Sequence, residues 1–74
     1  MIDIFQMSEF IQFYLKEYPE LKIKTCYNPG GMYLNFTIKS DKGVSNGCFP
    51  CYETSEAIEK MNYIIIDFLA RVGV

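Results

Sequence analysis

The sequence LKIKTCYNPGGMYLNFTIK, residues 21–39, decides the fold. Hydrophobic and polar side chains alternate through residues 21–27 and again through residues 32–39, which is typical of half-buried strands. Between these runs, Asn28-Pro29-Gly30-Gly31 has the composition of a tight turn, because proline presets its own φ and glycine accepts a positive φ. The segment therefore predicts an antiparallel hairpin with one buried face.

The alternation assigns each residue of the hairpin to a face. The side chains expected to face the core are Leu21, Ile23, Thr25, Tyr27, Met32, Leu34, Phe36 and Ile38. The opposite face is expected to present Lys22, Lys24, Tyr33, Asn35, Thr37 and Lys39. That second face is mixed in character, basic and partly aromatic.

Three further elements extend outward from the hairpin. A turn at residues 40–43, with Gly43 suited to a left-handed position, leads to a weaker strand at residues 44–49. Apolar residues at helical spacing predict a helix over residues 4–18, capped by Asp3 or Ser8. A second helix is predicted over residues 55–72. Its expected caps are Thr54 or Ser55 and Gly73, with an i, i+4 pair between Glu56 and Lys60.

The element order is α-β-β-β-α. We expect an α+β fold in which a three-stranded antiparallel meander carries both helices on one face. Residues 1–74 are expected to form a single domain, since 74 residues is at the small end of the domain range. Half of the residues are apolar and 22% are charged, which is typical of a folded chain and not of disorder.

Charge and hydropathy exclude several function classes. The net charge is −2, and no strongly basic cluster is present of the kind that a phosphate-backbone binder needs. No apolar run approaches the roughly 20 residues of a membrane span. Asp3 stands near the start of the chain without a basic flank, so no signal peptide is predicted and a cytoplasmic location is expected.

Cys48-Phe49-Pro50-Cys51 is the one short motif of a kind that carries chemistry. A redox function would need a low-pKa thiolate, and a zinc site would need four ligands where the chain offers three cysteines and no histidine. The favoured interpretation is that these thiols pack as small apolar groups against the second helix. No catalytic residue, metal site or cofactor is predicted, and we do not expect an enzyme.

Two features suggest a protein-binding surface. The carboxylates Glu53, Glu56 and Glu59 recur at a spacing of three and either complement the helix dipole or steer a basic partner. Aromatic residues exceed what so thin a domain can bury, and exposed apolar patches usually mark interfaces. The predicted interface residues are Glu53, Glu56, Glu59, Phe13, Tyr33 and Tyr63.

The element order resembles the double-stranded RNA-binding domain over residues 8–72, with Thr54-Ser55-Glu56-Ala57 at the start of its last helix. That family places a lysine cluster there to grip phosphates. This chain has Glu53, Glu56 and Glu59 instead. The departure removes the residues that RNA binding needs.

The same order, with small size and acidic charge, also resembles some phage-encoded anti-CRISPR proteins. That resemblance implies a chain that occupies the nucleic-acid site of a CRISPR or other defence effector. The sequence therefore predicts a small non-enzymatic protein-binding module that inhibits a nucleic-acid-handling complex. The alternatives are a degenerate nucleic-acid-binding domain that uses the basic sheet face, and a self-associating module such as a homodimer.

Overall fold

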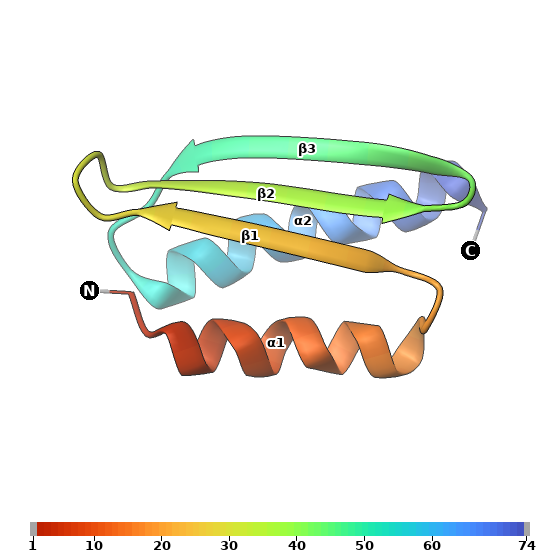
Figure 1. The fold of residues 1–74 in the computed structure, drawn as a ribbon, viewed down its shortest axis with the longest axis horizontal. Coiled ribbons are helices and arrows are strands. Elements are labelled where there is room, and N and C mark those ends of the chain that lie inside the picture. Colours follow the sequence, from red (N-terminus) through yellow and green to blue (C-terminus); the bar gives the residue numbers. More distant parts are fainter. Residues whose placement is uncertain (1, 74) are drawn as a thin grey trace.

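The computed structural model describes residues 2–73 and has the predicted α-β-β-β-α order (Figure 1). The elements are α1 (Ile4–Glu17), β1 (Lys22–Asn28), β2 (Tyr33–Ser40), β3 (Gly43–Pro50) and α2 (Thr54–Val72). At most of the element ends, the observed bound differs from the predicted one by a single residue. The alternation of faces is unaffected by these shifts.

The three strands form one antiparallel sheet in the order β1-β2-β3, and both helices lie on the same face of it (Figure 1). The predicted α+β fold is therefore confirmed. β2 is the central strand, so β1 and β3 each leave one edge without a strand neighbour. No helix within residues 2–73 has both the length and the apolar character needed to cross a membrane.

The core lies between β2 and α2. Leu34, Phe36 and Ile38 of β2 are fully or almost fully buried. They pack in the same cluster as Met61, Ile65 and Phe68, which are the fully or almost fully buried large side chains of α2. Burying a large apolar side chain contributes about 1.5–3 kcal/mol, so this contact is the main source of stability.

α1 packs beside α2 and is less deeply buried. Its one buried residue is Met7, which joins the core. Tyr14 stacks at 6.5 Å on Tyr18 and donates a hydrogen bond from its hydroxyl to the Asn62 side chain of α2. Partial burial, with a smaller contribution from Tyr18, raises the pKa of Tyr14 above its usual value, so the phenol stays protonated and able to donate.

The helix ends confirm some of the predicted caps. Asp3 caps α1, since its carboxylate accepts hydrogen bonds from the backbone N–H groups of Phe5 and Gln6. Gly73 ends α2 in the left-handed conformation, with φ of 75°. The predicted N-cap of α2 was wrong: Glu53 holds that position, and the Thr54 hydroxyl instead accepts the backbone N–H of Asp3 at 2.6 Å. This bond joins the starts of the two helices.

The first turn also differs from prediction. Met32 was expected to face the core, but it lies in the turn before β2 and is 41% exposed. Met32 also adopts the left-handed conformation, with φ of 55°, where a glycine was expected. Gly30, Gly31 and Gly43 do not have positive φ. Instead, the Asn28 side chain shapes the turn by accepting the backbone N–H groups of Gly30 and Gly31.

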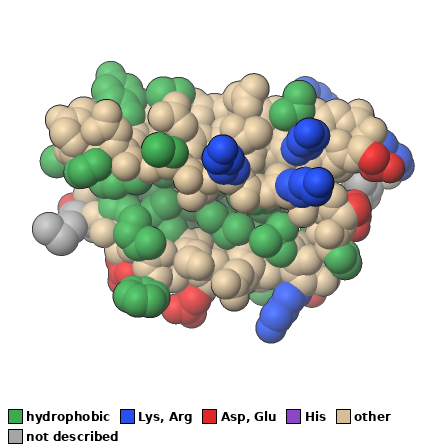
Figure 2. All heavy atoms as spheres, viewed as in Figure 1, with side chains coloured by type: hydrophobic (Ala, Val, Ile, Leu, Met, Phe, Trp, Pro, Cys, Tyr) green, Lys and Arg blue, Asp and Glu red, His purple; other side chains and the backbone are tan. Residues whose placement is uncertain are grey.

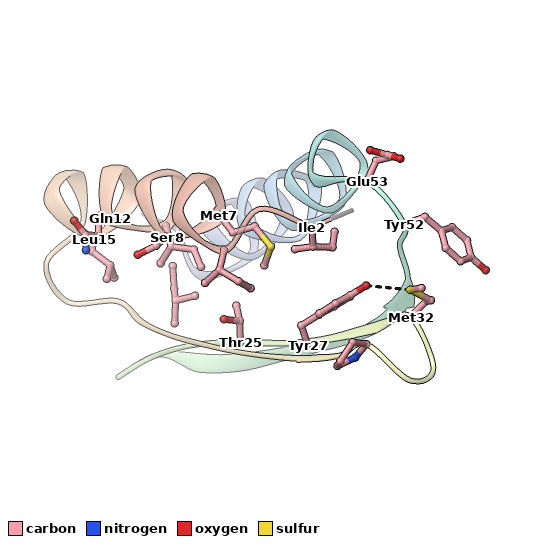
Figure 3. A pocket seen from close by; sticks show the side chains of 14 residues that line it. Ile2, Met7, Ser8, Gln12, Leu15, Thr25, Tyr27, Met32, Tyr52 and Glu53 are labelled. Carbon is pink, nitrogen blue, oxygen red and sulfur yellow. Dashed lines mark hydrogen bonds between the residues drawn. The ribbon is translucent and has the colours of Figure 1, made fainter.

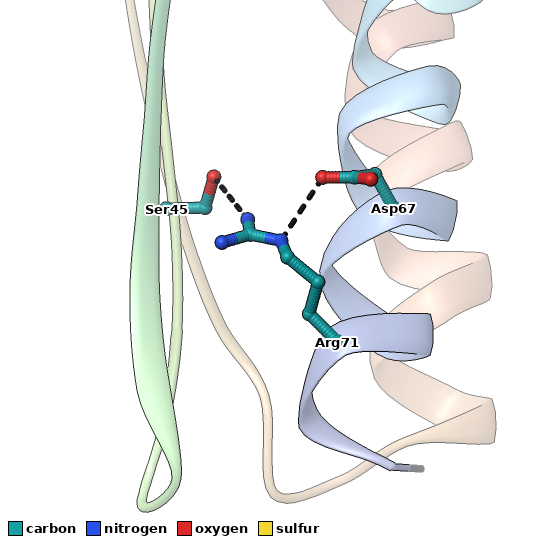
Figure 4. Close-up of polar contacts among 3 residues, drawn as sticks. All are labelled: Ser45, Asp67 and Arg71. Atoms are coloured by element: carbon teal, nitrogen blue, oxygen red, sulfur yellow. Dashed lines mark hydrogen bonds and ion pairs between the residues drawn. The ribbon is translucent and has the colours of Figure 1, made fainter.

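Arg71 connects the last turn of α2 to the neighbouring edge strand. Its guanidinium donates to the Asp67 carboxylate at 3.0 Å and to the Ser45 hydroxyl of β3 at 3.1 Å (Figure 4). Both members of the ion pair are more than half exposed, so the pair itself contributes little to stability. The two bonds link the last turn of α2 to β3.

Replacing Phe36 with alanine is expected to lower the free energy of unfolding by about 3–5 kcal/mol, because it opens a cavity at the centre of the core. At about 0.05–0.15 kcal/mol per residue, a chain of this size is stable by about 4–11 kcal/mol. Phe36→Ala should therefore lose a large part of its stability, measured as a marked fall in the midpoint of urea denaturation followed by circular dichroism.

Tyr33→Ala is the matched control, since Tyr33 lies in the same strand but on the exposed face. We expect a loss of about 1 kcal/mol or less for it. Equal losses in the two variants would contradict the assignment of the buried face.

Candidate functional site

An apolar groove runs between α1 and β1 (Figures 2 and 3). Its volume is about 1140 Å³. Figure 2 shows hydrophobic side chains gathered in a band between the sheet layer and α1, on the face where β1 is the outermost strand. The groove is therefore a surface feature that is open to solvent.

One face of α1 forms the wall of the groove. The residues that line it recur at helical spacings of three and four, which places them on one stripe of the helix. They are Ile4, Met7, Ser8, Ile11, Gln12 and Leu15. The aromatic residues Phe10 and Tyr14 lie on a different part of the helix, and Tyr14 contacts α2. The apolar surface of α1 is thus wider than its contact with the core.

The inner face of β1 forms the floor of the groove. Ile23, Thr25 and Tyr27 lie in the core-facing register, as predicted, yet all three remain partly exposed. The corresponding residues of β2 are completely covered, because β2 lies between two strands and over α2. The open floor results from β1 being an edge strand that α1 only partly covers.

One end of the groove has a distinct composition. The Tyr27 hydroxyl donates to the Met32 sulfur at 3.2 Å, and Tyr52 and Glu53 lie beyond them (Figure 3). The positive φ of Met32 places it at this end instead of in the core. Met32 and Tyr52 add two exposed apolar side chains to the surface.

The opposite face of the sheet carries the predicted basic residues. Lys22 of β1 lies directly across from Lys39 of β2, and Lys24 is two residues farther along β1. All three are exposed, and among residues 2–73 none of them has an ion-pair partner. Tyr33 lies at the other end of β2, opposite Asn28. The lysines and the aromatic residue are therefore not brought together into one nucleic-acid surface.

The six predicted interface residues do not form a single site. Glu59 and Tyr63 line a shallow hollow on the exposed face of α2, together with Ile66. Phe13 is exposed on α1, Tyr33 lies on the outer face of the sheet, and Glu53 lies at the end of the groove. Their role in binding stays a prediction.

Glu56 has a structural role that the sequence left open. Its carboxylate accepts the backbone N–H of Tyr52 at 2.8 Å, which stabilises the start of α2. The predicted pair with Lys60 is not formed, because Lys60 donates to the Pro50 carbonyl oxygen and lies 5.4 Å from the centre of the Phe49 ring. A charge reversal at Glu56 would therefore perturb the fold as well as any interface.

The two cysteines of the Cys48–Cys51 motif point to different environments. Cys48 is exposed on the outer face of β3, whereas Cys51 is fully buried in the core. Burial raises the pKa of the Cys51 thiol, and the nearby charge of Glu56 raises it further, while Lys60 acts in the opposite direction. This is the reverse of the low pKa that a redox thiol needs. Residues 2–73 contain no group of three or more side chains placed to hold a metal ion.

Comparison with known proteins does not assign the chain to a family. No family model, no curated protein and no solved structure matches it. The functional interpretation therefore depends on the geometry of the groove and the surfaces around it.

The sequence suggested exposed apolar residues but did not locate the groove. Its floor residues were predicted as core, and three residues of its wall, Met7, Ile11 and Leu15, belong to the apolar spacing that predicted the first helix. Two features of the sequence together could have indicated the groove. The apolar stripe of the first helix is broader than one packing contact needs, and the strand that follows it lies at the edge of the sheet.

The positions of the cysteines predict two classes of thiol reactivity. In native buffer at about pH 8, Cys26 and Cys48 should react rapidly with 5,5′-dithiobis(2-nitrobenzoate), because both are exposed. Cys51 should react only as the protein unfolds, since its thiol is buried and little thiolate forms there. The rates are read from absorbance with and without denaturant.

A variant that combines Cys26→Ser and Cys48→Ser serves as the control, and its rapid phase should disappear. Rapid reaction of Cys51 in the folded variant would contradict the buried position of this residue.

Proposed function

We propose that this chain is a small non-enzymatic module that binds another protein through the groove between α1 and β1. The observation that carries the proposal is the apolar lining of this groove, which two separate elements build and nothing within residues 2–73 covers. Contiguous apolar surface of this kind is costly to leave in water and usually marks an interaction site.

The composition of the groove supports binding over catalysis. Its lining includes one carboxylate, Glu53, and no histidine, lysine or cysteine. General acid–base and nucleophilic catalysis both need a nucleophile or proton carrier next to a second polar group that activates it. The polar side chains along the groove, such as Ser8 and Gln12, are suited to hydrogen bonding with a bound chain.

The aromatic residues at the groove end supply candidate anchors. Tyr27 and Tyr52 combine a large apolar ring with a hydroxyl that can accept or donate a hydrogen bond. Such residues dominate the binding energy of many interfaces. Tyr52 is 59% exposed, so most of its ring is available to a partner.

A narrower form of the proposal names the partner as a nucleic-acid-handling or defence complex that the bound chain inhibits. It comes from the resemblance to anti-CRISPR proteins, and its support is the element order together with the net charge of −2. The exposed Glu59 and Tyr63 would then contribute to a second contact on α2.

The test compares two substitutions in the first turn of α1. Ile4 lines the groove and Phe5 does not, although both are exposed, at 60% and 84%. Ile4→Asp should reduce partner capture by about tenfold or more, because it places a charge in the apolar groove. Phe5→Asp should leave capture within about twofold, since it adds the same charge outside the groove. Both charges lie at a helix N-terminus, where they are tolerated.

Each immobilised protein is incubated with lysate of the cells that carry this sequence, and bound proteins are quantified by mass spectrometry. A stoichiometric protein that is captured by the unmodified chain and by Phe5→Asp, but lost with Ile4→Asp, supports the proposal. Capture that is unchanged by Ile4→Asp, or no stoichiometric protein at all, contradicts it. If the protein that is captured in an Ile4-dependent way is a nucleic-acid-handling enzyme, the narrower form of the proposal is supported.

A further inference from the structure

We propose that the groove and the free edge of β1 together bind an extended segment of the partner in which apolar and acidic residues alternate. The segment adds to the sheet as a fourth strand beside β1. This inference rests on the proposed function and names the chemical class of the bound partner. Three observations support it: the unpaired strand edge, the apolar surface on one side of that edge and the lysines on the other.

The first observation is the edge itself. β1 pairs along its whole length with β2, from Lys22 opposite Lys39 to Asn28 opposite Tyr33. Its other side has no strand neighbour (Figure 1). Every second residue of such an edge presents unpaired backbone N–H and C=O groups, which are a template for another strand. β1 has seven residues, so a segment of similar length can pair with it.

The second observation is the position of the groove relative to this edge. A strand added to β1 would lie about 4.8 Å away and would direct every second side chain to the inner face. On that side it would meet Thr25 of β1 and Leu15 of α1 (Figure 3). Ile23 and Ile11 line the groove with them. Apolar side chains at alternate positions would cover this exposed surface.

The third observation is the charge on the other side of the edge. Lys22 and Lys24 project from the outer face of β1, and Lys39 lies beside Lys22. Cross-strand neighbours on one face lie about 5 Å apart, where opposite charges stabilise pairing and like charges weaken it. The outward side chains of the added strand would therefore be acidic where they lie beside Lys22 and Lys24.

The same charges argue against a second copy of this chain as the occupant. Pairing of two β1 edges would place both sets of Lys22, Lys24 and Lys39 on one continuous face. The outer-face residues of the three strands include no aspartate or glutamate to offset them. An acidic segment from a different protein would neutralise the positive charge of the lysines, whereas a second copy would add more positive charge to the same face.

The experiment uses a fluorescein-labelled peptide of seven residues, the length of β1, with valine at alternate positions and glutamate between them. Its binding to the full chain is measured by fluorescence anisotropy at low ionic strength. Two control peptides accompany it. One carries lysine in place of each glutamate, and the other keeps the side chains but is N-methylated at alternate residues, which removes the donors on one strand edge.

We expect the acidic peptide to bind at least about tenfold more tightly than the lysine peptide, because the latter faces like charges. N-methylation should weaken binding by at least about tenfold, since the backbone pairing is lost. Lys24→Glu should weaken binding of the acidic peptide by about fivefold or more. The ratio of the affinities of the acidic and lysine peptides should fall as a result. Lys42→Glu, in the β2–β3 turn, is the matched control and should change binding by less than about twofold.

Circular dichroism and the urea midpoint of each variant should show that the fold is retained, because both lysines are exposed. Equal binding of the acidic, lysine and N-methylated peptides would overturn the inference. So would a stable dimer in light scattering that dissociates with Ile4→Asp, since a second copy would then occupy the groove. If no acidic peptide binds but capture of a protein still depends on Ile4, the inference fails and the proposed function stands. If no protein is captured in a way that depends on Ile4, the proposed function itself is contradicted.

Discussion

The contact between β2 and α2 is the interaction on which the rest of the structure depends. Phe36 and Phe68 are the largest of the fully buried side chains, and they come from these two elements. Because the domain has only two layers, no other pair of elements can bury as much apolar surface. The other elements are placed relative to this pair. β3 lies along the second side of β2 and is joined to α2 by Arg71, while β1 and α1 occupy the opposite side.

The groove follows from how α1 is attached. α1 is anchored at its start, where the backbone N–H of Asp3 binds Thr54, and in its last turn, where Tyr14 binds Asn62. Both anchors connect it to α2 and not to β1. α1 therefore packs beside α2 and leaves the inner face of β1 partly open. A stable sheet edge next to an uncovered apolar surface is the physical basis of the binding function proposed above.

The sequence predicts the architecture well because each element has its own local signal. Alternation over residues 21–27 and 32–39 sets the two faces of the hairpin, and the i, i+3 and i+4 spacing of apolar residues sets the helices. Local chemistry was less informative where several residues could satisfy the same requirement. Asn28 and Met32 shape the first turn where glycines were expected to do so. Thr54 bonds to Asp3 where it was expected to cap its own helix.

The site was harder to predict, because periodicity identifies apolar faces but not the element that covers them. Ile23 and Ile11 have the spacing of core residues, and they are exposed to the groove only because α1 is held by α2. The acidic run illustrates the reverse problem. Glu56 accepts a hydrogen bond from the Tyr52 backbone, which its spacing in the sequence did not indicate, and its part in an interface stays a prediction. Such partners are set by the tertiary structure.

The most direct test of this account is native-state hydrogen exchange of the backbone amides of the free protein, resolved by NMR. Amides of β2 and of the buried face of α2 should exchange only through global unfolding, because these elements form the stable core. Alternate amides of β1, those on its free edge, should exchange orders of magnitude faster, since they have neither a strand partner nor cover from α1. Uniform protection along β1, equal to that of β2, would show that the edge and the groove are closed and would contradict the account.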